Sequence, residues 1–178
     1  MIASLVVTVI GRDKPGLVNA LSEKVAAFGG SWLESRMARL AGEFAGIVLV
    51  DLPEANVDAL AAALRDLEAT GLRSTVERSA GGPPHGSYKT LKLDLVAHDR
   101  PGIVRDITQV LAQQGVNIEE FTSRIASASF SGERLFEATA RLLVRDNFAI
   151  DDLRKKLERL ANEMMVDITL GDYGERGM

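Results

Sequence analysis

Two short segments of the chain share residue types whose spacing could bind a small anion. They are Asp13-Lys14-Pro15-Gly16-Leu17-Val18 and, 86 residues later, Asp99-Arg100-Pro101-Gly102-Ile103-Val104. A proline is tolerated in the first turn of a helix because the N–H that it lacks has no partner there. A glycine lets a ligand approach the backbone closely, and the unpaired N–H groups of a helix start attract anions. Each segment therefore predicts a binding site for a carboxylate, such as that of an amino acid. Asp13 or Asp99 is expected to be the helix N-cap.

A single segment of this kind could equally be a plain turn between a strand and a helix. The duplication favours a functional role, because the segments occupy the same place in a longer repeat. The same offset pairs Gly29 with Gly115 and Glu34 with Glu120, whereas further on the second copy carries seven extra residues around 127–134. A repeat unit of this length is a domain and not a solenoid repeat.

The glycines and prolines between the copies indicate a linker. We predict a first domain at residues 1–79, a linker rich in glycine and proline at 80–88, a second domain at 89–172 and a tail at 173–178.

Each half shows the same succession of hydrophobic periods. Apolar residues alternate from Leu5 to Val9 and from Leu91 to Leu95, which is typical of a strand with one buried face. Helical spacing then begins at the motif and ends at Gly29 or Gly115. Two strands, a second helix and a closing strand follow, so the predicted order is βαββαβ, twice. The ranges expected for these strands are 32–40, 44–51 and 72–78 in the first half, and 118–128, 135–144 and 165–170 in the second.

Right-handed crossovers place both helices of a βαββαβ unit on one face of its antiparallel sheet. We therefore expect an α+β chain of two ferredoxin-like domains in tandem. The open face of the second sheet carries Lys92 and Asp94, but the first has Val6 and Thr8 at these positions and the apolar run 47–50. An apolar open face usually marks a covered surface, which predicts association through sheet faces or edges, and a homodimer. The alternative is that these are scattered surface valines without a role in association.

The element order and the repeated motif resemble the ACT domain, a module that binds amino acids and other small effectors at domain interfaces. The resemblance covers nearly the whole chain. Segments 32–44 and 117–124 are similar to the tandem ACT-domain repressors of the glycine cleavage system.

This resemblance implies a sensor and not an enzyme. It implies an effector that is glycine or another amino acid, no cofactor, and a transcription factor or metabolic protein as partner. In ACT pairs the effector lies between the first turn of one domain and the start of strand two in its neighbour. The ligand-binding residues implied here are Asp13, Pro15, Gly16, Leu17, Asp99, Arg100, Pro101, Gly102, Ile103 and Asn117. The first copy has Ser31 where Asn117 stands, so the second site is expected to bind better.

His98 precedes the second motif and is a further candidate ligand contact, because an imidazole can form a hydrogen bond to a ligand or respond to pH near neutrality. The alternative is an exposed histidine at the end of a strand. The two histidines share no spacing that would indicate a metal site.

Two other function classes stay open. A small ferredoxin-like hydrolase could bind an anion with Arg12 or Arg100, although the sequence shows no evident pairing of a nucleophile with a general base. An RNA-binding module would need aromatic residues on the open sheet face, and we expect none on the first strand of either copy. The net charge of −4 also argues against RNA, and no direct DNA binding is expected.

The composition of the chain indicates where in the cell the protein is expected. The 178 residues include no cysteine, which fits a reducing compartment. The apolar start, residues 2–10, lacks a basic segment before it and is expected to be a strand and not a signal peptide. No apolar run reaches the ~18 residues that span a bilayer. We predict a cytoplasmic protein with no membrane partner.

Overall fold

The computed structural model describes residues 1–79, 86–127 and 133–173. The chain divides into two compact units, Met1–Pro83 and Pro84–Met178. Most of the predicted linker, the extra segment of the second copy and the end of the tail lie outside the described residues. Among the described helices, none combines the length and hydropathy that crossing a membrane requires.

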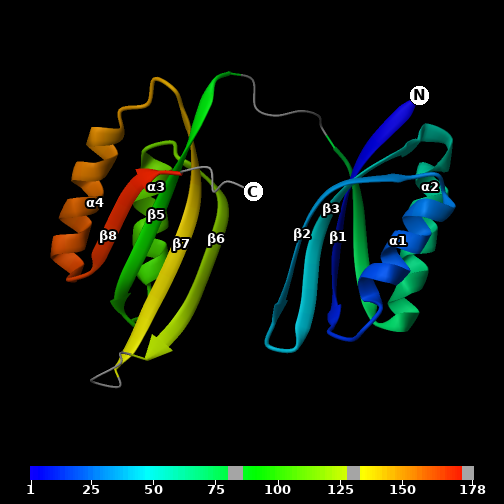
Figure 1. The fold of residues 1–178 in the computed structure, drawn as a ribbon, viewed down its shortest axis with the longest axis horizontal. Coiled ribbons are helices and arrows are strands. Elements are labelled where there is room, and N and C mark those ends of the chain that lie inside the picture. The colour runs from blue at the N-terminus through cyan, green and yellow to red at the C-terminus, as the bar shows by residue number, and fades with distance from the viewer. Residues whose placement is uncertain (80–85, 128–132, 174–178) are drawn as a thin grey trace. The chain divides into compact units, whose positions relative to one another are not determined.

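The first unit contains a four-stranded antiparallel sheet with its helices on one face (Figure 1). The strand order is β2-β3-β1-β4. The elements are β1 (Ile2–Arg12), α1 (Leu17–Ala27), β2 (Ser31–Leu40), β3 (Glu43–Pro53), the short 3-10 helix η1 (Glu54–Asn56), α2 (Val57–Arg65), the 3-10 helix η2 (Asp66–Thr70) and β4 (Leu72–Arg78).

The second unit repeats this architecture with the strand order β6-β7-β5-β8. Its elements are β5 (Tyr88–His98), α3 (Ile103–Gln113), β6 (Asn117–Ser127), β7 (Arg134–Arg145), α4 (Ile150–Met164) and β8 (Asp167–Asp172). Both units therefore have the predicted βαββαβ order and the ferredoxin-like fold is confirmed. The strand β5 begins at Tyr88, inside the predicted linker, so the expectation that neither first strand holds an aromatic residue is wrong at this position.

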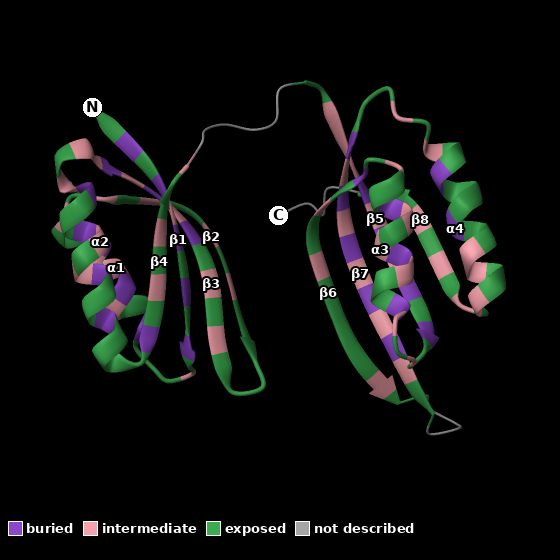
Figure 2. Ribbon diagram, turned by 180° about the vertical axis from the view of Figure 1, so that it is seen from behind, coloured by how far each residue is buried: buried purple, intermediate pink, exposed green. Residues whose placement is uncertain are grey.

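Each unit has its own hydrophobic core between sheet and helices, which the buried stripes in Figure 2 show. The alternating residues of the first strands are almost fully buried, with Leu5 at 0% and Leu91 at 1% exposed. Their partners on the first helices repeat at the predicted helical spacing, with Leu21 and Ile107 at the centre. Two separate cores allow each unit to present its own motif on a rigid frame.

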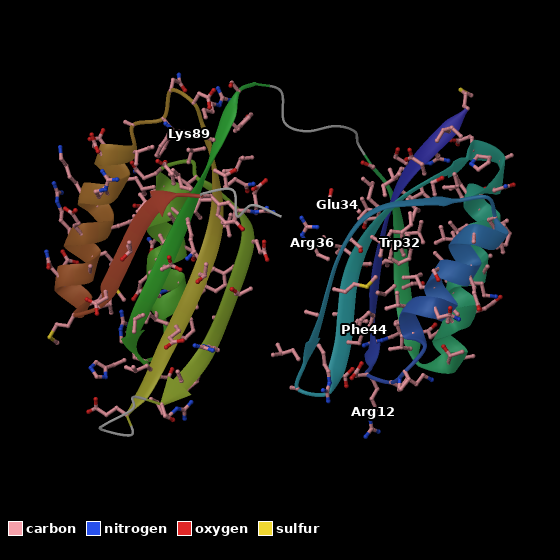
Figure 3. All side chains as sticks on the ribbon, in the orientation of Figure 1. Arg12, Trp32, Glu34, Arg36, Phe44 and Lys89 are labelled. Carbon is pink, nitrogen blue, oxygen red and sulfur yellow. The ribbon has the colours of Figure 1, made fainter. Side chains whose placement is uncertain are left out.

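Both units have a β-bulge at the same point of their second strand. The register shifts between Trp32 and Glu34 in β2, and between Ile118 and Glu120 in β6. A bulge inserts one residue and reverses the side chain alternation beyond it. Trp32 consequently packs against the core, whereas Glu34 lies on the side of the sheet away from the helices (Figure 3).

Candidate functional site

The Pro-Gly pair of each motif forms the turn before the first helix of its unit. Gly16 has φ 93° and ψ −2°, and Gly102 has φ 87° and ψ −3°. These angles match the third residue of a type II turn, which favours proline before it and needs glycine because φ is positive. The glycines are the N-cap residues, so Pro15 and Pro101 lie before the helix and not in its first turn as predicted.

No side chain caps either helix start. The first bonds within the helices run from the N–H of Ala20 to the carbonyl of Gly16 at 2.9 Å, and from the N–H of Asp106 to the carbonyl of Gly102 at 3.0 Å. The N–H groups of the three residues before each of these donors have no acceptor within the helix, as at any helix start. Each motif therefore presents the donors that a carboxylate requires.

The predicted N-cap role of Asp13 and Asp99 is wrong. Each aspartate lies three positions before the N-cap and forms an ion pair with an arginine of the neighbouring hairpin. The Asp13 carboxylate lies 2.8 Å from Arg39, and that of Asp99 lies 3.0 Å from Arg134. The backbone N–H groups of both aspartates also donate to this hairpin, at 2.9 and 3.1 Å. The aspartates therefore hold the turn against the sheet.

The start of α3 carries a cluster of charges. The carboxylate of Asp106 accepts hydrogen bonds from Arg105 at 2.7 Å and from Arg100 at 2.9 Å. The hydrogen bond from Arg105, and then that from Arg100, lowers the pKa of Asp106 below its ordinary value. A Cβ added to Gly102 would lie 3.2 Å from the guanidinium of Arg105, which places this group over the glycine. Two cations and one anion leave a net positive charge beside the unpaired N–H groups.

The first unit differs at these positions. Lys14 replaces Arg100, and its ammonium donates to the carbonyl of Thr70 at 2.5 Å, at the end of η2. Asn19 and Ala20 stand where the second unit has Arg105 and Asp106. The cation that replaces Arg100 in the first unit is therefore bound to the protein backbone, and the positions of Arg105 and Asp106 carry no charge there.

The side chains of Leu17 and Ile103 are 5% and 4% exposed and belong to the two cores. Only their backbone N–H groups can face a ligand. The residues after them, Val18 and Val104, are 43% and 39% exposed. These two valines were not among the predicted site residues. The signal that could have revealed them is the repeat itself, which retains valine one position after a core residue, on the outer side of the helix.

Asn117 lies at the opposite end of α3 from the motif. It begins β6 and lines an open hollow of about 520 Å3 with residues along the length of the helix, among them Arg105, Thr108 and Gln109. The 11 residues of α3 span about 16 Å, which separates Asn117 from the turn at Gly102. Within this unit Asn117 and the turn at Gly102 lie at opposite ends of the helix, and Arg105, whose guanidinium lies beside Gly102, lines the same hollow as Asn117.

His98 ends β5 and its side chain is 69% exposed, with Nδ1 3.9 Å from the carboxylate of Glu133. The equivalent residue of the first unit, Arg12, projects beyond the end of β1 (Figure 3). Both side chains are close in sequence to the motif but lie on the strand side of the turn. Within the described ranges, no group of three or more His, Cys, Asp or Glu side chains could hold a metal ion.

Comparison with known protein families decides the classification. Sequence profiles of the ACT domain match residues 3–76 and residues 85–166. The chain belongs to the ACT-domain family. Each of its two ACT repeats contains one Pro-Gly turn, at the start of its first helix.

Three relatives illustrate the range of proteins that contain similar repeats. The glycine cleavage system transcriptional repressor of Escherichia coli is 30% identical over 131 residues, which are 70% of this chain and 66% of the repressor. A phosphoserine phosphatase of Mycobacterium tuberculosis is also 30% identical, over 96% of this chain but only 41% of the enzyme. The crystal structure of a protein of unknown function from Galdieria sulphuraria is 30% identical, with a TM-score of 0.86 covering 98% of this chain and 100% of that one.

Proposed function

We propose that this protein senses an amino acid and binds the carboxylate of this effector at the start of α3. The observation that carries the proposal is the uncapped helix start at Gly102, with the guanidinium groups of Arg100 and Arg105 beside it. Backbone N–H groups and a net positive charge at one point are suited to a carboxylate. ACT repeats bind small amino-acid effectors in general, and we propose glycine or another small amino acid here.

The effector site is completed by a second ACT repeat. Asn117 can donate and accept hydrogen bonds, so it suits both ends of a zwitterion. It begins β6 at the far end of α3 from the turn of its own repeat, so we propose that the turn and the asparagine that bind one effector come from two copies of the domain. Binding would then stabilise one arrangement of domains over another, which is how a ligand without chemistry can regulate.

The second repeat provides the better binding site for the carboxylate of the effector. In the first repeat the ammonium of Lys14 is held by a carbonyl, and Ser31 is shorter than Asn117 and offers one hydroxyl. We therefore assign the effector contacts chiefly to Arg100, Pro101, Gly102, Arg105 and Asn117, and Asp99 acts through its hold on the turn.

The regulated process is amino-acid metabolism, through contact with a transcription factor or a metabolic protein. This part of the proposal is supported by the similarity to the Escherichia coli repressor. The net charge of −4 supports contact with protein and not with DNA.

Titration calorimetry of the full chain against the twenty amino acids tests the proposal. Replacement of Gly102 by alanine should abolish binding because Cβ would strain the backbone at φ 87° and press on the guanidinium of Arg105. Gly115 provides the matched control, since it ends the same helix at φ 68° with no atom within 4 Å of an added Cβ. Binding that is equally weak in Gly102→Ala and Gly115→Ala, or no binding of any amino acid to the wild type, would refute the proposed site.

A phosphatase assay with phosphoserine separates the enzyme alternative, because the similarity to the Mycobacterium enzyme covers 41% of that protein. Phosphate release from phosphoserine that persists after dialysis against a metal chelator, and that is lost when Arg100 is replaced, would favour a hydrolase. A salt-dependent mobility shift with single-stranded RNA would favour the third class, for which Tyr88 is the aromatic candidate on the first strand of the second repeat.

A further inference from the structure

The second unit has an open hollow of about 740 Å3 between the first turn of α4 and the end of β8, which lie at the same end of the unit (Figure 1). We call it the α4–β8 hollow. Its floor is apolar and is formed by Leu91, Phe148, Ile150 and Leu170. Leu91 is 1% exposed, and the other three pack partly buried against the second core. A hollow of this volume with an apolar floor has the size and the character of a site for a small molecule.

The rim of the α4–β8 hollow carries more negative than positive charge. The charged residues that line it are Asp151, Asp152, Asp172, Arg154 and Lys155. The guanidinium of Arg154 is turned toward Asp151, with which it forms an ion pair of 2.9 Å. In the described part of the chain, neither Asp152 nor Asp172 has a hydrogen-bond or ion-pair partner for its carboxylate. The hollow therefore combines two available carboxylates with an apolar floor.

The same corner of the first unit holds a cation that belongs to the protein itself. Arg78 pairs with Leu5 in the register of the first sheet. Asp172 pairs with Leu91, the equivalent of Leu5, in the second sheet, so an aspartate replaces the arginine. The guanidinium of Arg78 donates two hydrogen bonds to the carboxylate of Glu54, at 2.6 and 3.1 Å, and joins the end of β4 to η1. The first unit therefore closes this corner with a guanidinium and a carboxylate.

The second unit lacks this pair but keeps acidic residues on both sides of the corner. Counted from the start of the second helix of each unit, Asn147 stands where the first unit has Glu54. Asp151 stands where the first unit has Asp58. Asp58 lies close enough to Arg78 that its charge, after the hydrogen bond with Glu54 and the charge of that carboxylate, raises the pKa of Arg78. With an aspartate in place of the arginine, the second corner has carboxylates on its helix side and its strand side and has lost the guanidinium between them.

We propose that the α4–β8 hollow binds a small organic cation, with a guanidinium or ammonium group on an aliphatic stem. The cationic group lies where the first unit has the guanidinium of Arg78 and donates hydrogen bonds to Asp152 and Asp172, which are strong because both partners are charged. The stem packs on the apolar floor, as the stems of arginine and lysine side chains pack on apolar surfaces of proteins. A carboxylate ligand would meet the acids of the rim. The inference therefore goes beyond the proposed function and does not depend on it.

Titration calorimetry of the full chain with butylguanidinium tests this site. The probe has one guanidinium on an aliphatic stem and no carboxylate, so it lacks the group that the proposed effector site at α3 binds. Asp172→Asn should weaken binding at least about 10-fold, because a hydrogen bond between two charged groups is lost. Asp167→Asn removes the same charge from the other end of β8 and should leave the affinity unchanged. No saturable binding to the wild type, or equal weakening in both variants, would overturn the inference.

A double variant supplies the missing cation from within the protein. Asn147→Glu together with Asp172→Arg gives the second corner the residues that form the ion pair of Glu54 and Arg78 in the first. The new guanidinium should occupy the place of the ligand, so this variant should show no saturable binding of butylguanidinium. Binding as tight as that of the wild type would contradict the proposal.

Nuclear magnetic resonance locates the bound probe on the chain. The backbone amides of Ile150 and Gly171, which line the α4–β8 hollow, should shift during titration of the isotope-labelled wild type with butylguanidinium. The amide of Gly102, at the start of α3, should not move. Shifts centred on Gly102 would place the cation at the effector site and sink the inference.

Discussion

The carboxylate of Asp99 lies 3.0 Å from the guanidinium of Arg134, which ties the turn before α3 to the first residue of β7. The motif aspartate therefore acts on the sheet side of the turn and leaves the helix start open to a ligand. In the first repeat Asp13 also pairs with an arginine of the neighbouring hairpin, but Arg39 lies in β2, whereas Arg134 lies in β7.

The first prediction concerns this ion pair. Because 70% of the Arg134 side chain is exposed, the coupling energy between Asp99→Ala and Arg134→Ala in a double-mutant cycle should be about 0.2–1 kcal/mol. Urea unfolding followed by circular dichroism gives the four free energies of unfolding. Hydrogen exchange at the first amides of α3 should stay unchanged in Asp99→Ala. Faster exchange confined to these amides would restore the helix-cap role.

The second prediction concerns pH. The pKa of Asp106 is lowered by its hydrogen bonds with Arg105 and then Arg100, so its contribution to stability is present above the ordinary carboxyl value of 3.8 and is lost as the pH falls through the lower value of the folded state. The melting temperature of Asp106→Asn should therefore lie below that of the wild type at pH 7 and approach it as the pH falls toward 2.

Asp152→Asn is the control for this experiment, because Asp152 is an exposed acid on α4 outside the cluster. Its melting curve should follow the wild type across the same range. The same Asp106→Asn variant should bind a carboxylate effector more tightly at pH 7, since the site gains one positive charge. A weaker effector affinity would show that Asp106 positions the arginines for binding.

The third prediction concerns close packing at Gly11. A Cβ at this position would lie 2.2 Å from the carbonyl oxygen of Gly71, a backbone atom that cannot move aside cheaply. Gly11→Ala should lower the free energy of unfolding of the first repeat by about 1–3 kcal/mol or more. The second repeat has Ala97 at the equivalent position, so Ala97→Gly should cost only about 0.5–1 kcal/mol. Thermal unfolding of both variants makes the comparison, and equal losses would contradict it.

The fourth prediction concerns Asn117. Asn117→Ser gives the second repeat the residue that the first has at Ser31, and loss of one hydrogen bond to the effector should weaken binding about 10-fold. Asn117 is exposed, so the unfolding midpoint should not change. Calorimetry with the best-binding amino acid measures the effect. The reciprocal Ser31→Asn serves as a control, and an unchanged affinity in Asn117→Ser would remove this residue from the site.

The local elements were predictable because they depend on short-range patterns. Alternation from Leu5 to Val9 and helical spacing from Leu17 determined strand and helix, and the glycines at 29 and 115 end their helices as expected, with φ of 70° and 68°. The duplicated motif, together with the order of the elements, also indicates the family. The bulge between Trp32 and Glu34 was not predicted, because the register of β2 depends on its pairing with β3.

Like the fold, the candidate site has parts that the sequence predicts and parts that it does not. The two Pro-Gly turns follow from steric limits within a few residues, so the motif alone located them. The partners of Asp13 and Asp99 come from a hairpin more than twenty residues away, and no local pattern encodes that contact.

The amino-acid sequence by itself therefore determined the two repeats, the order of their elements and the positions of their turns, because backbone sterics and hydrophobic periodicity act over a few residues. Only the tertiary structure decided which charges meet and that Asn117 lies a helix length from Gly102. It also placed Val6, Ile10 and Ile47 together on one uncovered face. These relationships depend on strand order and register, which bring distant parts of the chain into contact.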